Sequence, residues 1–162
     1  MRIYGGDPTR RTSLTMTEGA DDVGAFYLQV FPHGSSVVAL ENNGWSGTVP
    51  EIARRASAGG RFLSVHWNVN GLFRVTEAIK GTVTAYFEPS PGAGPVAPDD
   101  VVPAWASDIE FTAGPLRATC FALVEVETGV AFERQWCEAT LPTYRVPDPD
   151  VLLTGVANAR TP

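Results

Sequence analysis

The clearest pattern in the chain is an alternation of apolar and polar side chains in the segment RFLSVHWNVN, residues 61–70. Successive side chains of a β-strand point to opposite faces of the sheet. The segment therefore predicts a strand with one apolar and one polar face. The apolar face holds Leu63, Val65, Trp67 and Val69, and the polar face holds Ser64, His66, Asn68 and Asn70.

Two more strands follow in GLFRVTEAI, residues 71–79, and GTVTAYF, residues 81–87. Asn70-Gly71 predicts a type I′ hairpin turn, whose two central residues both need positive φ. In that register Trp67 faces Arg74, with which we expect it to stack. The second sheet face then collects Ser64, His66, Asn68, Phe73, Val75, Glu77, Thr84 and Tyr86. A slip of one residue inverts this assignment.

The preceding segment predicts a hairpin, a turn and a helix. Residues 24–30, GAFYLQV, and residues 35–41, SSVVALE, have the branched and aromatic content of strands. Asn42, Asn43 and Gly44 then favour a sharp turn.

The helix is predicted from its start and stop signals. Thr48 and Glu51 have the T-x-x-E spacing of a capping box, and Pro50 suits a first helical turn. We expect a helix that begins near Val49 and ends at Gly59-Gly60.

The C-terminal half predicts a loop followed by helices. Five prolines in residues 88–103 indicate a surface connection. Asp99 or Asp100 is a candidate cap for a short helix through Trp105. LRATCFALVEVET, residues 116–128, predicts a helix, and AFERQWCEAT, residues 131–140, predicts a last one.

The resulting order of elements is typical of an α+β protein. It predicts a five-stranded antiparallel sheet, with one helix between the second and third strands and two or three C-terminal helices, the element order of profilin-like and longin-like domains. We expect an irregular N-terminal arm at residues 1–22, a single α+β domain at residues 23–147 and a loose tail at residues 148–162.

Composition narrows the classes of function. The 162 residues are 44% hydrophobic and 19% charged, as in ordinary globular domains. The net charge of −6 argues against nucleic-acid binding. Cys120 and Cys137 indicate neither a disulfide framework nor a zinc site, and no spacing predicts a metal or cofactor. No signal peptide or membrane span is apparent, so we expect a cytoplasmic protein without membrane attachment.

Two groups of residues are candidates for a site. On the polar sheet face His66, Glu77 and Tyr86 are expected to converge as acid, orienting group and donor, with Asn68 beside them. The alternative is that these polar groups only meet water or bond beneath a covering helix.

The second group is a candidate interaction loop formed by Asn42, Asn43 and Trp45. Its amides and indole suit a ligand rim with an aromatic floor. Alternatively the asparagines serve the turn and the tryptophan anchors the loop on the core.

Three segments carry a resemblance to a known family. They are ENNGWSG, the strand pair RFLSVHWNVNGLFRVTEA and the later ETGVAFERQW, with Trp45, Trp67 to Asn70 and Thr128 to Val130 as the repeated features. Through these, the chain resembles a family of small actinobacterial proteins known only as a domain of unknown function. The resemblance extends from the GGDP segment to YRVP. The family has no established activity, so the resemblance implies no catalytic residue.

Three functions follow as hypotheses. The first is a small non-enzymatic protein that binds another protein, as an adaptor or immunity-type component of a bacterial defence system. The second is an enzyme or small-ligand binder that uses the polar face around His66. The third is a structural subunit of a larger assembly, including a homo-oligomer.

Overall fold

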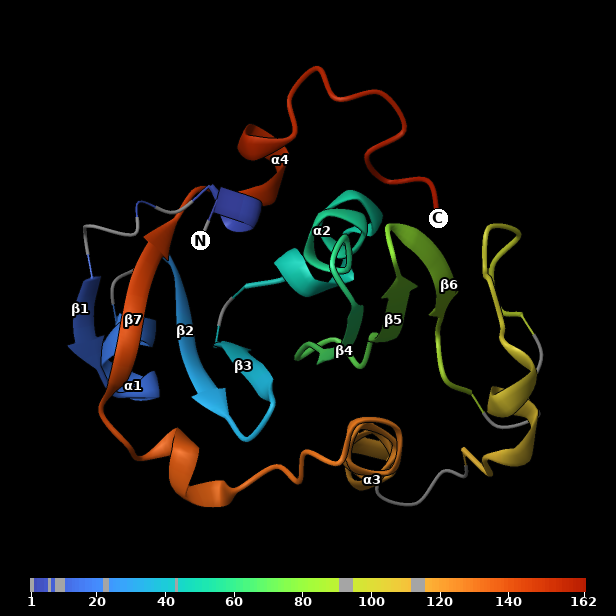
Figure 1. Ribbon diagram of the computed structural model, residues 1–162, viewed down its shortest axis with the longest axis horizontal. Coiled ribbons are helices and arrows are strands. Elements are labelled where there is room, and N and C mark those ends of the chain that lie inside the picture. The colour runs from blue at the N-terminus through green and yellow to red at the C-terminus, as the bar shows by residue number, and fades with distance from the viewer. Residues whose placement is uncertain are drawn as a thin grey trace. The chain divides into compact units, whose positions relative to one another are not determined.

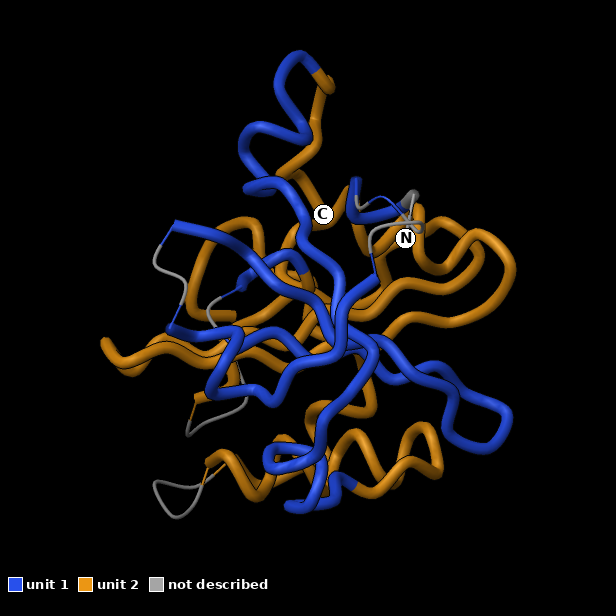
Figure 2. Tube along the Cα trace, turned by 90° about the vertical axis from the view of Figure 1, so that its left-hand side faces the viewer, with its two compact units in different colours: residues 1–46, 132–155 blue, residues 47–131, 156–162 orange. Residues whose placement is uncertain are grey.

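The computed structural model describes residues 2–5, 7, 11–21, 24–42, 44–90, 95–111 and 116–162. Its helices and strands confirm the predicted α+β class (Figure 1). The chain divides into two compact units, coloured separately in Figure 2. Unit 1 comprises Met1–Ser46 and Phe132–Gly155, and unit 2 comprises Gly47–Ala131 and Val156–Pro162.

The prediction of one five-stranded sheet is wrong, because the described strands form two antiparallel sheets. The sheet of unit 1 has four strands in the order β1-β7-β2-β3. These are β1 (Arg11–Leu14), β2 (Phe26–His33), β3 (Ser36–Glu41) and β7 (Leu141–Val146). The β2–β3 hairpin is the one that the sequence predicts. β7 inserts between β1 and β2, so the sheet joins both ends of the chain.

Unit 1 also contains short helical elements: η1 (Arg2–Tyr4), α1 (Met16–Asp21), η4 (Arg134–Cys137) and α4 (Pro149–Leu152). Within residues 1–22, predicted to be irregular, β1 and α1 are thus regular elements. A capping box opens α1. Its Thr15 hydroxyl accepts from the Glu18 amide at 3.2 Å, and the Glu18 carboxylate accepts from the Thr15 amide at 2.7 Å.

The predicted helix over residues 131–140 is only the single turn η4. Its Trp136 is 7% exposed and packs edge-on against Phe31 and Phe132. One turn is enough to bury that indole, and the chain then extends into β7, which begins at Leu141.

Unit 2 is a three-stranded sheet between two helices. Its strands are β4 (Arg61–Trp67), β5 (Phe73–Ile79) and β6 (Thr82–Phe87), in the order β4-β5-β6. Figure 1 shows α2 (Pro50–Ala56) and α3 (Leu116–Thr128) on opposite faces of this sheet. The short η3 (Ala104–Asp108) follows the proline-rich connection.

The start of α2 is predicted correctly, but its capping box is not. Val49 is the N-cap and makes no side-chain cap bond. Glu51 instead accepts from the guanidinium groups of Arg54, at 3.2 Å, and Arg55, at 2.8 Å. Because two arginines one turn further along the helix bind this carboxylate, it does not accept from the backbone amide at the start of the helix.

The residues after α4, in the segment predicted to be loose, bond to α2. The amide of Glu51 donates to the carbonyl of Ala159 at 3.0 Å. Arg54 donates to the carbonyls of Asn158 and Thr161, each at 2.9 Å. These bonds satisfy backbone groups that a free tail would leave to water.

The β4–β5 register differs from the predicted one by one residue. Trp67 pairs with Phe73 and not with Arg74. The turn spans residues 68–72, because the Asn68 amide donates to the Leu72 carbonyl at 3.1 Å and the Gly71 amide donates to the Asn68 carbonyl at 3.2 Å. Gly71 has φ +80°. This is a longer loop in which only the glycine needs positive φ.

A turn with two successive positive φ angles does occur, in the β5–β6 hairpin. Lys80 has φ +49° and Gly81 has φ +80°, as a type I′ turn requires.

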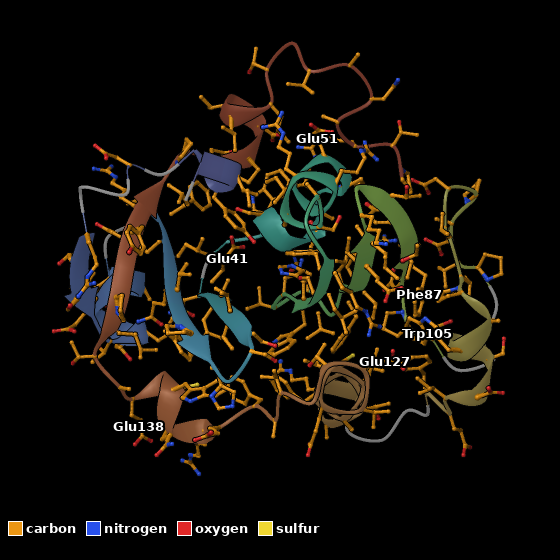
Figure 3. All side chains as sticks on the ribbon, in the orientation of Figure 1. Glu41, Glu51, Phe87, Trp105, Glu127 and Glu138 are labelled. Atoms are coloured by element: carbon orange, nitrogen blue, oxygen red, sulfur yellow. The ribbon has the colours of Figure 1, made fainter. Side chains whose placement is uncertain are left out.

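The observed register defines two faces of the sheet in unit 2. The α3 face carries Arg61, Leu63, Val65, Trp67, Phe73, Val75, Glu77, Ala85 and Phe87, and the α2 face carries Phe62, Ser64, His66, Arg74, Thr76, Ala78 and Tyr86. A buried apolar cluster lies on the α3 face, where Val75 and Phe87 pack with Leu123 of α3. Phe87 also packs edge-on against Trp105 of η3, with ring centroids 6.0 Å apart (Figure 3).

Candidate functional site

The α2 face brings together two of the four residues predicted as a ligand face, His66 and Tyr86. The residue between them is Arg74, which lies directly opposite His66 in the β4–β5 pairing. The guanidinium carbon of Arg74 lies 4.4 Å from the centre of the Tyr86 ring. This arrangement is a cation-π contact.

Asp100 holds Arg74 in this position. Arg74 Nη1 donates to Asp100 Oδ1 at 2.9 Å, and the Asp100 side chain is fully buried. The other carboxylate oxygen accepts from the amides of Val96 and Ala97 at 2.8 and 2.9 Å. With three donors around it, this carboxylate fastens the connection to the sheet and has little capacity to serve a ligand.

His66 is half-buried on the same face. Burial lowers its pKa, so the neutral imidazole is favoured. A neutral imidazole can accept a proton, and a carboxylate partner would fix its tautomer and orientation.

Glu77, the carboxylate predicted for that role, lies on the opposite α3 face. Its side chain is 3% exposed. It accepts from Arg61 Nε at 2.7 Å and from the Thr84 hydroxyl at 2.7 Å. Arg61 also donates to Glu127, near the end of α3. Glu127 is labelled in Figure 3. The predicted set of His66, Glu77 and Tyr86 is therefore not assembled.

Asn68, the fourth predicted residue of the ligand face, belongs to the hairpin turn. Its side-chain oxygen accepts from the amides of Asn70 and Leu72 at 2.9 and 3.1 Å. An asparagine that bonds its own turn in this way fixes backbone geometry. Its role in the described structure is to shape the β4–β5 loop.

The candidate interaction loop is organised by a residue that sequence reasoning missed, Glu41. Glu41, labelled in Figure 3, accepts a hydrogen bond from the Ser46 amide through its carboxylate at 2.8 Å. A Cβ atom at Gly44 would lie 2.7 Å from the Glu41 carboxylate, so the turn closes tightly around it. Asn42 donates to the Met16 carbonyl at 3.0 Å. Trp45 is partly exposed, and Asn43 lies outside the described residues.

A small hollow lies over the sheet of unit 1. Its volume is about 10 Å³, room for roughly one water molecule. Binding pockets for small molecules are far larger. The lining residues are Thr15, Met16, Gly19, Ala25, Tyr27, Gln29, Leu40, Asn42 and Thr143.

Exposed apolar side chains gather at the tip of the β4–β5 hairpin in unit 2, next to the α3 residues that contact Trp67. Val69 is 99% exposed and Leu72 is 40% exposed. Behind them the Trp67 ring meets the Phe121 ring edge-on, with centroids 5.3 Å apart. The guanidinium carbon of Arg117 lies 5.5 Å from the centre of the Trp67 ring. We call these five residues the tip patch.

Sequence reasoning found only part of the tip patch. The strand alternation assigned Val69 to the buried apolar face, but the turn begins at Asn68 and turns Val69 outward. Arg117 and Phe121 come from α3, and no local pattern indicates which strand that helix contacts. The i, i+4 spacing of these two residues is the available signal that they share a helix face.

No protein-family model, curated protein or solved structure matches the chain. In the part of the chain that the structure describes, no group of three or more His, Cys, Asp or Glu side chains is arranged to hold a metal ion. No described helix is both long and apolar enough to span a membrane. The chain is thus defined by its α+β class, its two antiparallel sheets and the tip patch.

Proposed function

We propose that this chain is a non-enzymatic protein-binding protein, an adaptor or immunity-type component of a bacterial system, and that it binds its partner through the tip patch. The observation that carries the proposal is the exposure of Val69 and Leu72 beside Trp67 and Arg117. Tryptophan and arginine are enriched among the few residues that carry most of the binding energy of protein interfaces. Burial of an exposed aliphatic side chain by a partner lowers the free energy of the complex.

The hairpin that presents these side chains is preorganised. Its turn is closed by the two backbone bonds of residues 68–72 and by the two bonds to the Asn68 side chain. Trp67 contacts both Phe121 and Arg117. A surface that is already ordered loses little conformational entropy on binding, which favours affinity.

The alternative, an enzyme or ligand binder around His66, has less support. The carboxylate expected to orient His66 faces the other side of the sheet, and the Asp100 carboxylate is committed to Arg74 and two amides. The resemblance to an actinobacterial family motivates the bacterial setting and supplies no reaction.

Affinity capture with the full chain tests the proposal. The wild type, the double variant V69S/L72S and the control V126S are immobilised and exposed to lysate of the native host. Val126 is 81% exposed on α3 and is not part of the tip patch. We expect a stoichiometric partner on the wild type and on V126S that V69S/L72S fails to retain.

The outcome that contradicts the proposal is a partner retained equally by all three proteins, or no stoichiometric partner on any of them. Equal thermal midpoints for the three proteins show that loss of binding does not come from unfolding.

A further inference from the structure

We infer that the partner segment presents a carboxylate next to an apolar side chain, so that the carboxylate pairs with Arg117 while the apolar group covers Val69 and Leu72. This inference rests on the proposed function and specifies the chemistry of the partner. Its basis is the electrostatic state of Arg117 within an acidic chain.

Arg117 differs from the arginines that stabilise unit 2. Those arginines are each paired with a carboxylate: Arg54 and Arg55 with Glu51, Arg61 with Glu77 and Glu127, and Arg74 with Asp100. Arg117 is exposed and makes no ion pair with a described residue. In a chain with six more acidic than basic residues, an arginine left without a carboxylate at an apolar surface is available to one from outside.

The geometry of Arg117 suits a carboxylate partner. Its guanidinium carbon lies over the Trp67 ring, 5.5 Å from the ring centre. A guanidinium placed over an aromatic ring still offers its N–H groups in the guanidinium plane for a bidentate bond.

The start of α3 adds to this preference. Arg117 is in the first turn of α3, which contains no acidic residue. The positive end of the helix dipole favours a negative charge there. A partner carboxylate at this position is therefore attracted by the Arg117 guanidinium and by the helix dipole. No acidic side chain of the first turn repels it.

A protein segment fits this surface better than a lipid headgroup. Anionic membrane surfaces attract polybasic clusters, whereas the tip patch has a single basic residue on a chain of net charge −6. A protein can supply one carboxylate and an apolar side chain without bringing a field of negative charge.

A displayed library of random peptides provides the probe. The library is selected on the immobilised full chain, and the dissociation constants of enriched peptides are measured for the wild type, R117Q, R117E and V69S/L72S. We expect enriched peptides to carry Asp or Glu within a few residues of Leu, Ile, Phe or Trp. We also expect R117Q to weaken them about tenfold, and a peptide with Lys in place of its acidic residue to recover binding to R117E.

The outcomes separate this inference from the proposed function. Peptides that depend on Val69 and Leu72 but are indifferent to R117Q overturn the inference and leave the proposed function in place. Peptides indifferent to all variants overturn both. A selection that yields no binder, or vesicles of phosphatidylserine that bind the wild type but not V69S/L72S, also overturns the inference.

Discussion

Single residues decide which chemistry this sheet can perform. Glu77 and His66 lie on neighbouring strands, and a shift of one residue in pairing places them on opposite faces. On its own face Glu77 becomes the buried centre of a network with Arg61 and Thr84. On the other face His66 has a guanidinium opposite it. Alternation along each strand is predictable, but the pairing between strands depends on the turn.

His66 provides a pH-dependent prediction. Burial lowers the pKa of His66 in the folded chain from the ordinary 6.5. At a pH between the folded and the unfolded pKa, the unfolded chain therefore binds more protons than the folded chain does. Stability is fully present above that ordinary pKa and falls as the pH drops through it toward the folded pKa. We expect NMR titration of the imidazole to give a midpoint below the ordinary value. We also expect wild type to lose more stability than H66Q between about pH 7 and pH 5. A midpoint at or above the ordinary value contradicts the burial argument.

Glu77 provides a prediction about stability. The substitution E77Q leaves Arg61 without its buried charge partner, and we expect it to lower the free energy of unfolding by about 2 kcal/mol. Urea denaturation measures this change. E125Q, at an exposed carboxylate of α3, serves as the control and should change stability by less than about 0.5 kcal/mol. Equal effects of the two substitutions would show that the network around Glu77 contributes nothing specific.

At the scale of elements, local signals predicted the central elements of the chain but missed β1, α1 and β7. The β2–β3 hairpin, the strands β4 to β6, α2 and α3 follow from alternation and apolar spacing. The predicted glycine stop of α2 is wrong, because the helix ends at Ala56 with Ser57 as its C-cap, before Gly59-Gly60. The T-x-x-E form of the capping-box spacing occurs twice, at Thr15 and at Thr48, and only the first forms the box. At Thr48, the Glu51 carboxylate instead accepts hydrogen bonds from Arg54 and Arg55. Sequence spacing cannot rank such competing partners.

The β4–β5 turn is the element on which the site depends, and Gly71 tests it. Gly71 has φ +80°, and nothing lies within 4 Å of the position that a Cβ atom would take. The substitution G71A therefore carries only the cost of the left-handed backbone, about 1 kcal/mol. Gly59 also has open space, without positive φ, so G59A is the matched control and should be neutral or slightly stabilising. Chemical denaturation of both variants checks this difference. Equal stabilities would contradict the assigned turn.

At the scale of the whole molecule, the sequence predicted one sheet and the chain forms two. β7 begins at Leu141, directly after the residues predicted as the last helix, and pairs with β1 and β2, which come early in the chain. Pairing between distant segments leaves no periodic signal, so an inference from element order counts only local strands. The tip patch escaped prediction for the same reason, because Arg117 and Phe121 come from α3.

The central claim is that Val69 and Leu72 form the contact surface for a protein partner. The most direct measurement is the ratio of the dissociation constants of the captured partner for V69S/L72S and for wild type, with V126S measured alongside. Loss of two buried aliphatic contacts predicts a ratio of about 30 or more, while V126S stays within about twofold of wild type. A ratio near one for the double variant, with all three proteins folded, would contradict the account.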